Sequence, residues 1–167
     1  MYNVFLVEDE IVVREGIRDS IPWDKTNYAL VGEAPDGEMA LSILKDVKAD
    51  ILVTDIKMPF MDGLALARVV KKTQPWVKII ILSGHDEFQF AREAISIGVE
   101  EYLLKPVSAS DMLKAFDKVA RGIEEEKRKL DSLEILRQQA LSSVDMLREK
   151  WLVALLSGSV DTADAIE

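Results

Sequence analysis

Five short apolar runs recur along the chain, and a segment with helical spacing of apolar residues follows each of them. The runs cover residues 4–7, 28–31, 51–54, 77–82 and 101–104. Runs so rich in Val, Ile and Leu are typical of strands that are buried on both faces. Strands that alternate with helices through short connections form a parallel sheet covered on both sides. The alternation therefore predicts one α/β domain with five parallel strands.

Composition limits the class of protein further. Of the 167 residues 49% are hydrophobic, which is enough for a real core, and the net charge of −9 argues against nucleic-acid binding through this surface. There is no cysteine, so disulfides and thiolate metal sites are excluded. The N-terminus lacks a basic signal-peptide start, and no run is long enough to span a membrane. We therefore expect a cytoplasmic protein without a membrane partner.

Polar groups follow four of the five predicted strands. Glu8 and Asp9 come after the first, Asp55 ends the third, Ser83 ends the fourth, and Lys105 follows the fifth. Right-handed crossovers place all of these strand ends on one edge of the sheet. In open α/β sheets ligands bind at that edge, where the strand order reverses. With a doubly wound, flavodoxin-like order of 2-1-3-4-5, the three carboxylates meet there.

Three carboxylates held together repel one another, unless a cation lies between them. Mg²⁺ suits such a site because it prefers oxygen ligands and needs only one or two carboxylates. We expect Asp9 and Asp55 to bind Mg²⁺ directly and Glu8 to act through a water. The backbone carbonyl of Lys57 completes the predicted metal site.

A carboxylate beside Mg²⁺ can attack a phosphoryl group and form an acyl phosphate. Transfer in line requires that the charge on the equatorial oxygens be neutralised. Mg²⁺ can take one oxygen, the ammonium of Lys105 a second and the hydroxyl of Ser83 a third. The residues therefore predict a phosphoacceptor at Asp55, with Lys105 and Ser83 as its partners.

Together these residues resemble the receiver domain of two-component response regulators over residues 2–122. The matching motifs are Glu8-Asp9, Asp55 with Met58-Pro59 and Asp62-Gly63, Ser83-Gly84, Tyr102, and Lys105-Pro106. Glu8 departs from the pattern, because many members have Asp at that position.

This resemblance implies several functional features. Asp55 takes phosphate from a sensor histidine kinase with Mg²⁺ as cofactor, and Ser83 and Tyr102 rearrange to report the phosphate. The peptide bond before Pro106 is cis. The only catalysis implied is that of the domain's own phosphorylation and dephosphorylation, so the protein is not otherwise an enzyme.

Beyond residue 115 the apolar residues change rhythm to a seven-residue repeat. The seam consists of Phe116, Val119, Ile123, Leu130, Leu133, Ala140, Val144, Leu147, Trp151 and Ala154. Only Glu126 and Arg137 interrupt it, so residues 116–154 predict a parallel coiled coil in a homodimer. The alternative is a single long helix that folds back onto another domain.

The domain organisation that follows is a receiver at residues 1–122, a helical linker at 123–157 and the start of a missing downstream region at 158–167. His85–Phe90 and 101–106, followed by such a helix, resemble AraC-type response regulators. That resemblance implies a C-terminal module that binds DNA, which the present residues do not contain.

Three other functions compete with this prediction. A phosphatase of the haloacid dehalogenase type needs a second Asp two positions after its nucleophile, where this chain has Lys57. A flavodoxin-like cofactor binder needs a first loop that cradles phosphate, and the acidic residues 8–10 would repel one. A receiver-like interaction module that is never phosphorylated would not need the intact acidic site.

Overall fold

Strands and helices alternate in the folded chain as the apolar runs predict. The computed structural model describes residues 1–84 and 88–158. The predictions for His85 and for residues 159–167 lie outside the described residues. The elements are β1 (Tyr2–Val7), α1 (Ile11–Ser20), β2 (Tyr28–Ala34), α2 (Gly37–Leu44), β3 (Ile51–Asp55), α3 (Gly63–Thr73), β4 (Lys78–Ser83), α4 (Phe88–Ile97), β5 (Glu101–Leu104) and α5 (Ala109–Leu156). The chain divides into two units, residues 1–122 and 123–167, and each is described by itself.

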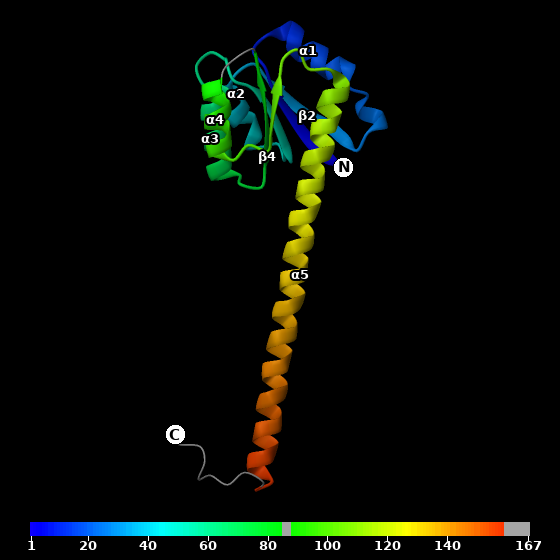
Figure 1. The fold of residues 1–167 in the computed structure, drawn as a ribbon, viewed down its shortest axis with the longest axis vertical. Helices are drawn as coiled ribbons and strands as arrows, with labels where there is room; N and C mark the ends of the chain where they lie inside the picture. Colours follow the sequence, from blue (N-terminus) through cyan, green and yellow to red (C-terminus); the bar gives the residue numbers. More distant parts are fainter. Residues whose placement is uncertain (85–87, 159–167) are drawn as a thin grey trace. The chain divides into compact units, whose positions relative to one another are not determined.

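The first unit is a five-stranded parallel sheet in the order β2-β1-β3-β4-β5, which confirms the predicted fold and strand order. Helices α2, α3 and α4 lie on one face, whereas α1 and the first turns of α5 lie on the other (Figure 1). Every residue of β3 is buried, as expected of the central strand of a sheet that is covered on both sides.

Helix α5 begins with a reciprocal cap. The Ser108 hydroxyl accepts the N–H of Asp111 at 3.1 Å and donates to Oδ2 of Asp111 at 2.7 Å. The first bond satisfies one of the amide groups that the first helical turn leaves without partners, and the second holds the hydroxyl in place. The sequence predicts a helix that starts near Asp111 with a cap at Ser108 or Ser110. In the structure Ser108 caps the helix, which begins at Ala109.

The predicted coiled-coil seam is wrong at its first two positions. Phe116 and Val119 are buried within the first unit, with only 1% and 4% of their surface exposed. The ring of Phe116 lies 5.0 Å from that of Tyr28 and 6.1 Å from that of Trp23. These side chains belong to the domain core, so they cannot pack against a second copy.

The second unit contains the remainder of α5, and its apolar side chains are exposed. Leu130, Leu133, Leu147 and Trp151 each expose more than half of their surface. In the described part of the chain, no helix combines the length and hydrophobicity that a membrane crossing needs.

Candidate functional site

The register of the strands brings the predicted site residues to one edge of the sheet. Val7 pairs with Thr54, so Glu8 and Asp55 each follow a matched pair on neighbouring strands. Asp55 pairs with Leu82, which places Ser83 one residue beyond it. Ser83 in turn pairs with Leu104, and Lys105 follows. Backbone pairing alone therefore explains why residues so distant in sequence meet.

A cavity of about 230 Å³ lies at this edge. Its lining includes Asp9, Asp55, Lys57, Ser83 and Lys105, all of which the sequence predicts as site residues. Among the described residues, neither Glu8 nor Tyr102 lines this cavity. Among the predicted residues, the sheet edge thus presents the carboxylates of Asp9 and Asp55, the Ser83 hydroxyl and the Lys105 ammonium to one small polar space, which Glu10 also lines.

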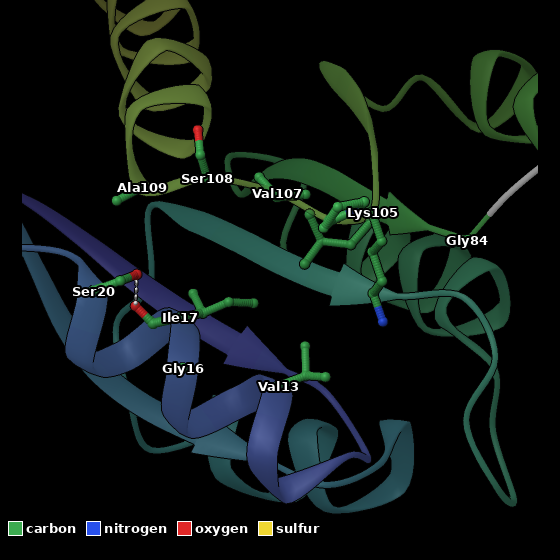
Figure 2. A pocket seen from close by; sticks show the side chains of 11 residues that line it. Val13, Gly16, Ile17, Ser20, Gly84, Lys105, Val107, Ser108 and Ala109 are labelled. Atoms are coloured by element: carbon green, nitrogen blue, oxygen red, sulfur yellow. Dashed lines mark hydrogen bonds between the residues drawn. The ribbon is translucent and has the colours of Figure 1, made fainter.

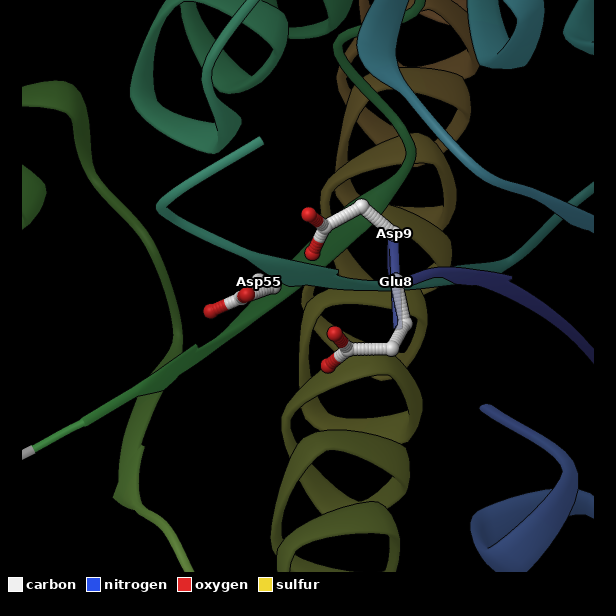
Figure 3. Close-up of side chains that lie close together, drawn as sticks. All are labelled: Glu8, Asp9 and Asp55. Carbon is white, nitrogen blue, oxygen red and sulfur yellow. The ribbon is translucent and has the colours of Figure 1, made fainter. Parts of the chain in front are cut away.

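The side chains of Glu8, Asp9 and Asp55 form the acidic part of the site. They come from the ends of β1 and β3 and point to the same side (Figure 3), and one carboxylate oxygen from each lies within 4.8 Å of the other two. Asp55 is almost fully buried, whereas Asp9 is half-buried. Oxygen donors gathered so closely suit a hard divalent cation such as Mg²⁺.

Lys105 supplies the positive charge that these carboxylates require. Its Nζ lies 2.7 Å from Oε2 of Glu8 and 3.0 Å from Oδ2 of Asp55. The peptide bond between Lys105 and Pro106 is cis, which confirms the expectation drawn from the resemblance. In this arrangement one ammonium lies between two buried carboxylates.

Burial is the largest single influence on the pKa of each of the three charged groups. It raises the pKa of Glu8 and of Asp55 despite the opposing effect of Lys105, and the charge of Asp55 raises the pKa of Glu8 further. Burial disfavours the charged form of Lys105 as well, but hydrogen bonds to Glu8 and Asp55 outweigh it and leave the pKa of Lys105 raised. The ammonium and the carboxylates therefore depend on one another for their charge.

Ser83 and Tyr102 occupy different positions relative to the cavity. Ser83 is fully buried, lines the cavity and donates its hydroxyl to the carbonyl of Gly84 at 3.1 Å. Tyr102 is half-buried in β5 and packs against the hydrophobic core. A switch role for either residue stays a prediction.

Two supporting residues, Arg14 and Thr54, were not predicted, whereas a third, Gly63, belongs to the predicted Asp62-Gly63 motif. Arg14 donates to the carbonyl of Glu8 at 2.6 Å, and Thr54 donates its hydroxyl to the carbonyl of Asp55 at 2.9 Å. The N–H of Gly63 donates to the carbonyl of Ile56 at 2.9 Å and so closes the loop after β3. The Asp62-Gly63 motif gives a signal for Gly63, but nothing in the sequence distinguishes Arg14 from the other charged residues of its helix.

A second, larger hollow of about 580 Å³ lies beside the acidic site. Val13 and Ile17 of α1 line it, and they face Val107 and Ala109 of the connection between β5 and α5 (Figure 2). Its lining is mostly apolar, and Lys105 is the only charged residue in it among those the structure describes. The chemistry therefore belongs to the smaller, polar cavity.

Comparisons with known proteins agree with this geometry. The sequence model of the response regulator receiver domain matches residues 4–117. The transcriptional regulatory protein YesN of Bacillus subtilis is 36% identical over 119 residues, which cover 71% of this chain and 32% of that protein. The transcriptional regulatory protein HptR of Staphylococcus aureus is 31% identical over 126 residues, which cover 75% and 49%. The chain thus spans about a third to a half of these curated relatives.

Solved structures show the same fold. The REC domain of AraT, a response regulator from Geobacillus stearothermophilus, is 38% identical with a TM-score of 0.65, and the match covers 77% of this chain and 97% of that one. A two-component transcriptional regulator AraC from Clostridium phytofermentans is 26% identical with a TM-score of 0.70, and the match covers 76% and 98%.

Proposed function

This chain belongs to the response regulator receiver domain family, and on that premise we propose that it is switched by phosphorylation of Asp55. The proposal depends chiefly on one observation. Asp9, Asp55, Ser83 and Lys105, which come from four strand ends, line a single polar cavity. These are the groups that an acyl phosphate on a carboxylate requires.

The proposed reaction is a transfer of one phosphoryl group from the phosphohistidine of a sensor histidine kinase. An oxygen of the Asp55 carboxylate attacks the phosphorus, the bond from phosphorus to the histidine nitrogen breaks, and the nitrogen keeps the electron pair. Lys105 would pair with one equatorial oxygen, because its Nζ already lies 3.0 Å from Asp55. The Ser83 hydroxyl would leave the carbonyl of Gly84 and donate to another.

The acidic cluster fits the Mg²⁺ ion that the family implies, because its donors are carboxylate oxygens, one from each residue within 4.8 Å of the other two. Asp9, Asp55 and the backbone carbonyl of Lys57 would hold the ion. Bound there, Mg²⁺ would neutralise charge on the phosphoryl oxygens. We propose no reaction on other substrates, since the side chain two positions after Asp55 is the exposed Lys57 rather than a second acid.

The output we propose is control of transcription through a C-terminal DNA-binding module. Two observations support it: the curated relatives carry transcriptional regulator names, and this chain covers less than half of each. Tyr102 and Ser83 would report the phosphate to the rest of the molecule. The predicted cytoplasmic location belongs to this proposal too.

The exposed apolar positions of α5 beyond residue 122 support a homodimer. Leu130, Leu133, Val144, Leu147 and Trp151 keep the seven-residue repeat of a coiled coil. In a parallel pair, Lys129 of one copy would lie opposite Glu134 of the other, which gives an attractive contact beside the seam. We therefore propose a coiled-coil seam at residues 123–154. It is shorter than the predicted seam because the buried Phe116 and Val119 are left out.

Incubation with acetyl phosphate and Mg²⁺ tests the function. The wild-type chain should gain the mass of one phosphoryl group, Asp55→Asn should gain none, and EDTA should prevent labelling of the wild type. Asp46→Asn is the matched control, because Asp46 is exposed and lies near the opposite end of β3. Labelling of Asp55→Asn would disprove the assignment, and a wild type that takes up no phosphate would favour the interaction module.

A further inference from the structure

Glu8 differs from the other two carboxylates in what it contacts. It is fully buried, and it is absent from the lining of the 230 Å³ cavity among the described residues. Its Oε2 accepts a hydrogen bond from Lys105 Nζ at 2.7 Å, and its Oε1 accepts the N–H of Glu10 at 3.2 Å. Both oxygens are therefore already engaged, with Lys105 as the closer partner.

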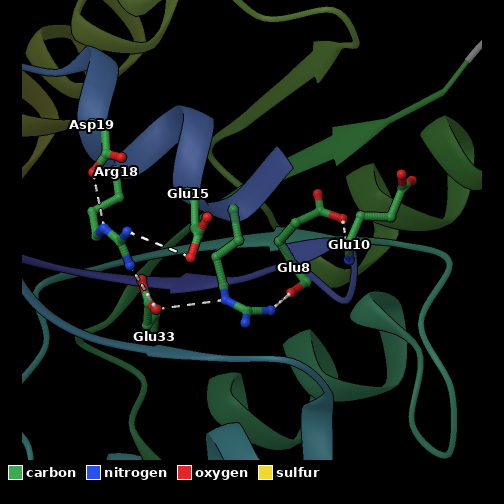
Figure 4. Close-up of polar contacts among 7 residues, drawn as sticks. Glu8, Glu10, Glu15, Arg18, Asp19 and Glu33 are labelled. Atoms are coloured by element: carbon green, nitrogen blue, oxygen red, sulfur yellow. Dashed lines mark hydrogen bonds and ion pairs between the residues drawn. The ribbon is translucent and has the colours of Figure 1, made fainter. Parts of the chain in front are cut away.

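Side chains of α1 and β2 hold the backbone at Glu8 in place. Arg14 donates to the carbonyl of Glu8 at 2.6 Å, and Arg14 also forms an ion pair with Glu33 at 3.6 Å between Nε and Oε1. Arg18 makes a second ion pair with Glu33, as part of the polar network around Glu8 and Glu10 (Figure 4). The end of β1 is thus tied to α1 and β2, which fixes the backbone from which the Glu8 side chain extends.

We propose that Glu8 is a positioning residue for Lys105. An ammonium has three N–H donors, and Glu8 takes one of them. A second faces Asp55, where the phosphoryl group would form, and the third is left for a phosphoryl oxygen. Lysine is a flexible side chain, so holding its end before the phosphate arrives pre-organises the site. The inference rests on the proposed function, and it is compatible with the expectation that Glu8 reaches Mg²⁺ through a water, because a carboxylate can accept more than two hydrogen bonds.

The position of Lys105 can be followed directly by nuclear magnetic resonance of the ¹⁵N-labelled chain of residues 1–167. A hydrogen-bonded, partly buried ammonium exchanges slowly enough to give an Nζ signal, which Lys105→Met assigns by its disappearance. Glu8→Gln should abolish the signal, and Glu8→Asp should weaken it, because the carboxylate on the shorter side chain starts farther from Nζ. Asp9→Asn is the matched control and should keep it. Persistence of the signal in Glu8→Gln would overturn the inference.

Titration with Mg²⁺ alone separates the two roles of Glu8. If Glu8 holds Lys105, saturating Mg²⁺ should shift the Lys105 signal without abolishing it. Loss of the signal on adding Mg²⁺ would mean that the metal recruits Glu8, which would contradict the proposal. Circular dichroism of each variant establishes that it is folded, so that a lost signal reports on Lys105.

Labelling rates give a second, independent measurement. Glu8→Gln should slow labelling by acetyl phosphate roughly tenfold, the scale found for residues that orient a ligand group. In a Lys105→Met background the same substitution should not slow labelling further, because the effects of substituting two residues that act as a unit are not additive. If Glu8→Gln slowed labelling by the same factor in the Lys105→Met background as in the wild type, the inference would be overturned. Normal labelling of the wild type at Asp55 would meanwhile leave the proposed function intact.

Discussion

The phenol of Tyr28 donates a hydrogen bond to Oδ1 of Asp117 at 2.6 Å, across 89 residues of sequence. Tyr28 opens β2 at the edge of the sheet, and Asp117 lies on α5. The neighbouring residue, Phe116, packs its ring against Tyr28. One aromatic side chain thus anchors the first turns of α5 to the sheet by both a polar and an apolar contact.

Removing the hydroxyl should weaken this anchor. We expect Tyr28→Phe to lower the free energy of unfolding by about 1 kcal/mol, the usual net value of one hydrogen bond, because the exposed Asp117 can turn to water instead. Urea unfolding followed by circular dichroism measures the loss. Asp117→Ala should cost at least as much, because it leaves the buried phenol without its acceptor, and the double variant should cost less than the sum of the two; additive losses would show that the two side chains act separately.

The same contact predicts a loss of stability in alkali. Burial, followed by the hydrogen bond to Asp117, raises the pKa of Tyr28 in the folded protein. The stability that this phenol contributes is therefore present below the unfolded pKa of about 10 and is lost above it, by about 1.4 kcal/mol per pH unit. Unfolding of the wild type and Tyr28→Phe between pH 8 and 11 should show their difference shrinking above pH 10. If the free energies of unfolding of the two proteins changed in parallel over this pH range, the raised pKa of Tyr28 would be contradicted.

Much of the fold follows from local patterns. The five strands are apolar runs, and the parallel sheet follows from their alternation with helices. Asp55 and Lys105 come together because each follows a strand end, which needs no knowledge of side-chain geometry. These features are therefore predictable from the order of residues alone.

Other features depend on distances that sequence does not encode. Which groups the Glu8 carboxylate contacts depends on the length of its side chain and on the position of its backbone, which Arg14 fixes by a hydrogen bond to the Glu8 carbonyl. Phe116 and Val119 satisfy a coiled-coil repeat and a sheet-packing helix equally well, since the two periods diverge by only about 20° in seven residues. Only the packed structure assigns them to the core.

Phe116 should accordingly behave as a core residue. With 1% of its surface exposed, Phe116→Ala removes a buried ring, and we expect a loss of about 3–5 kcal/mol in the free energy of unfolding. Leu130→Ala is the control from the same helix, because Leu130 is 67% exposed, and it should change the value by no more than about 0.5 kcal/mol in dilute, monomeric protein. Equal effects would contradict the assignment of Phe116.

Gly63 should be intolerant of a side chain because the loop after β3 passes so close to the site. A Cβ at Gly63 would run into the backbone carbonyl of Asp55, whereas one at Gly16 would meet nothing within 4 Å. Gly63→Ala should therefore lower both the melting temperature and the labelling of Asp55. Gly16→Ala, in the middle of α1, should raise stability by about 0.5–1 kcal/mol and keep labelling normal. Normal labelling in a Gly63→Ala protein would mean that the loop shifts freely.

The absence of cysteine makes the tail open to a direct test of pairing. In a parallel, in-register coiled coil, equivalent seam positions of the two copies face each other, so Val144→Cys and Leu147→Cys should each form a disulfide-linked dimer under mild oxidation. Ser142→Cys places the thiol on the side away from the seam and should give far less. Non-reducing gel electrophoresis of the three single variants measures the difference. An antiparallel pair would place Val144 opposite a different residue and leave Val144→Cys unlinked, and equal cross-linking at all three positions would indicate random collision instead of a defined seam.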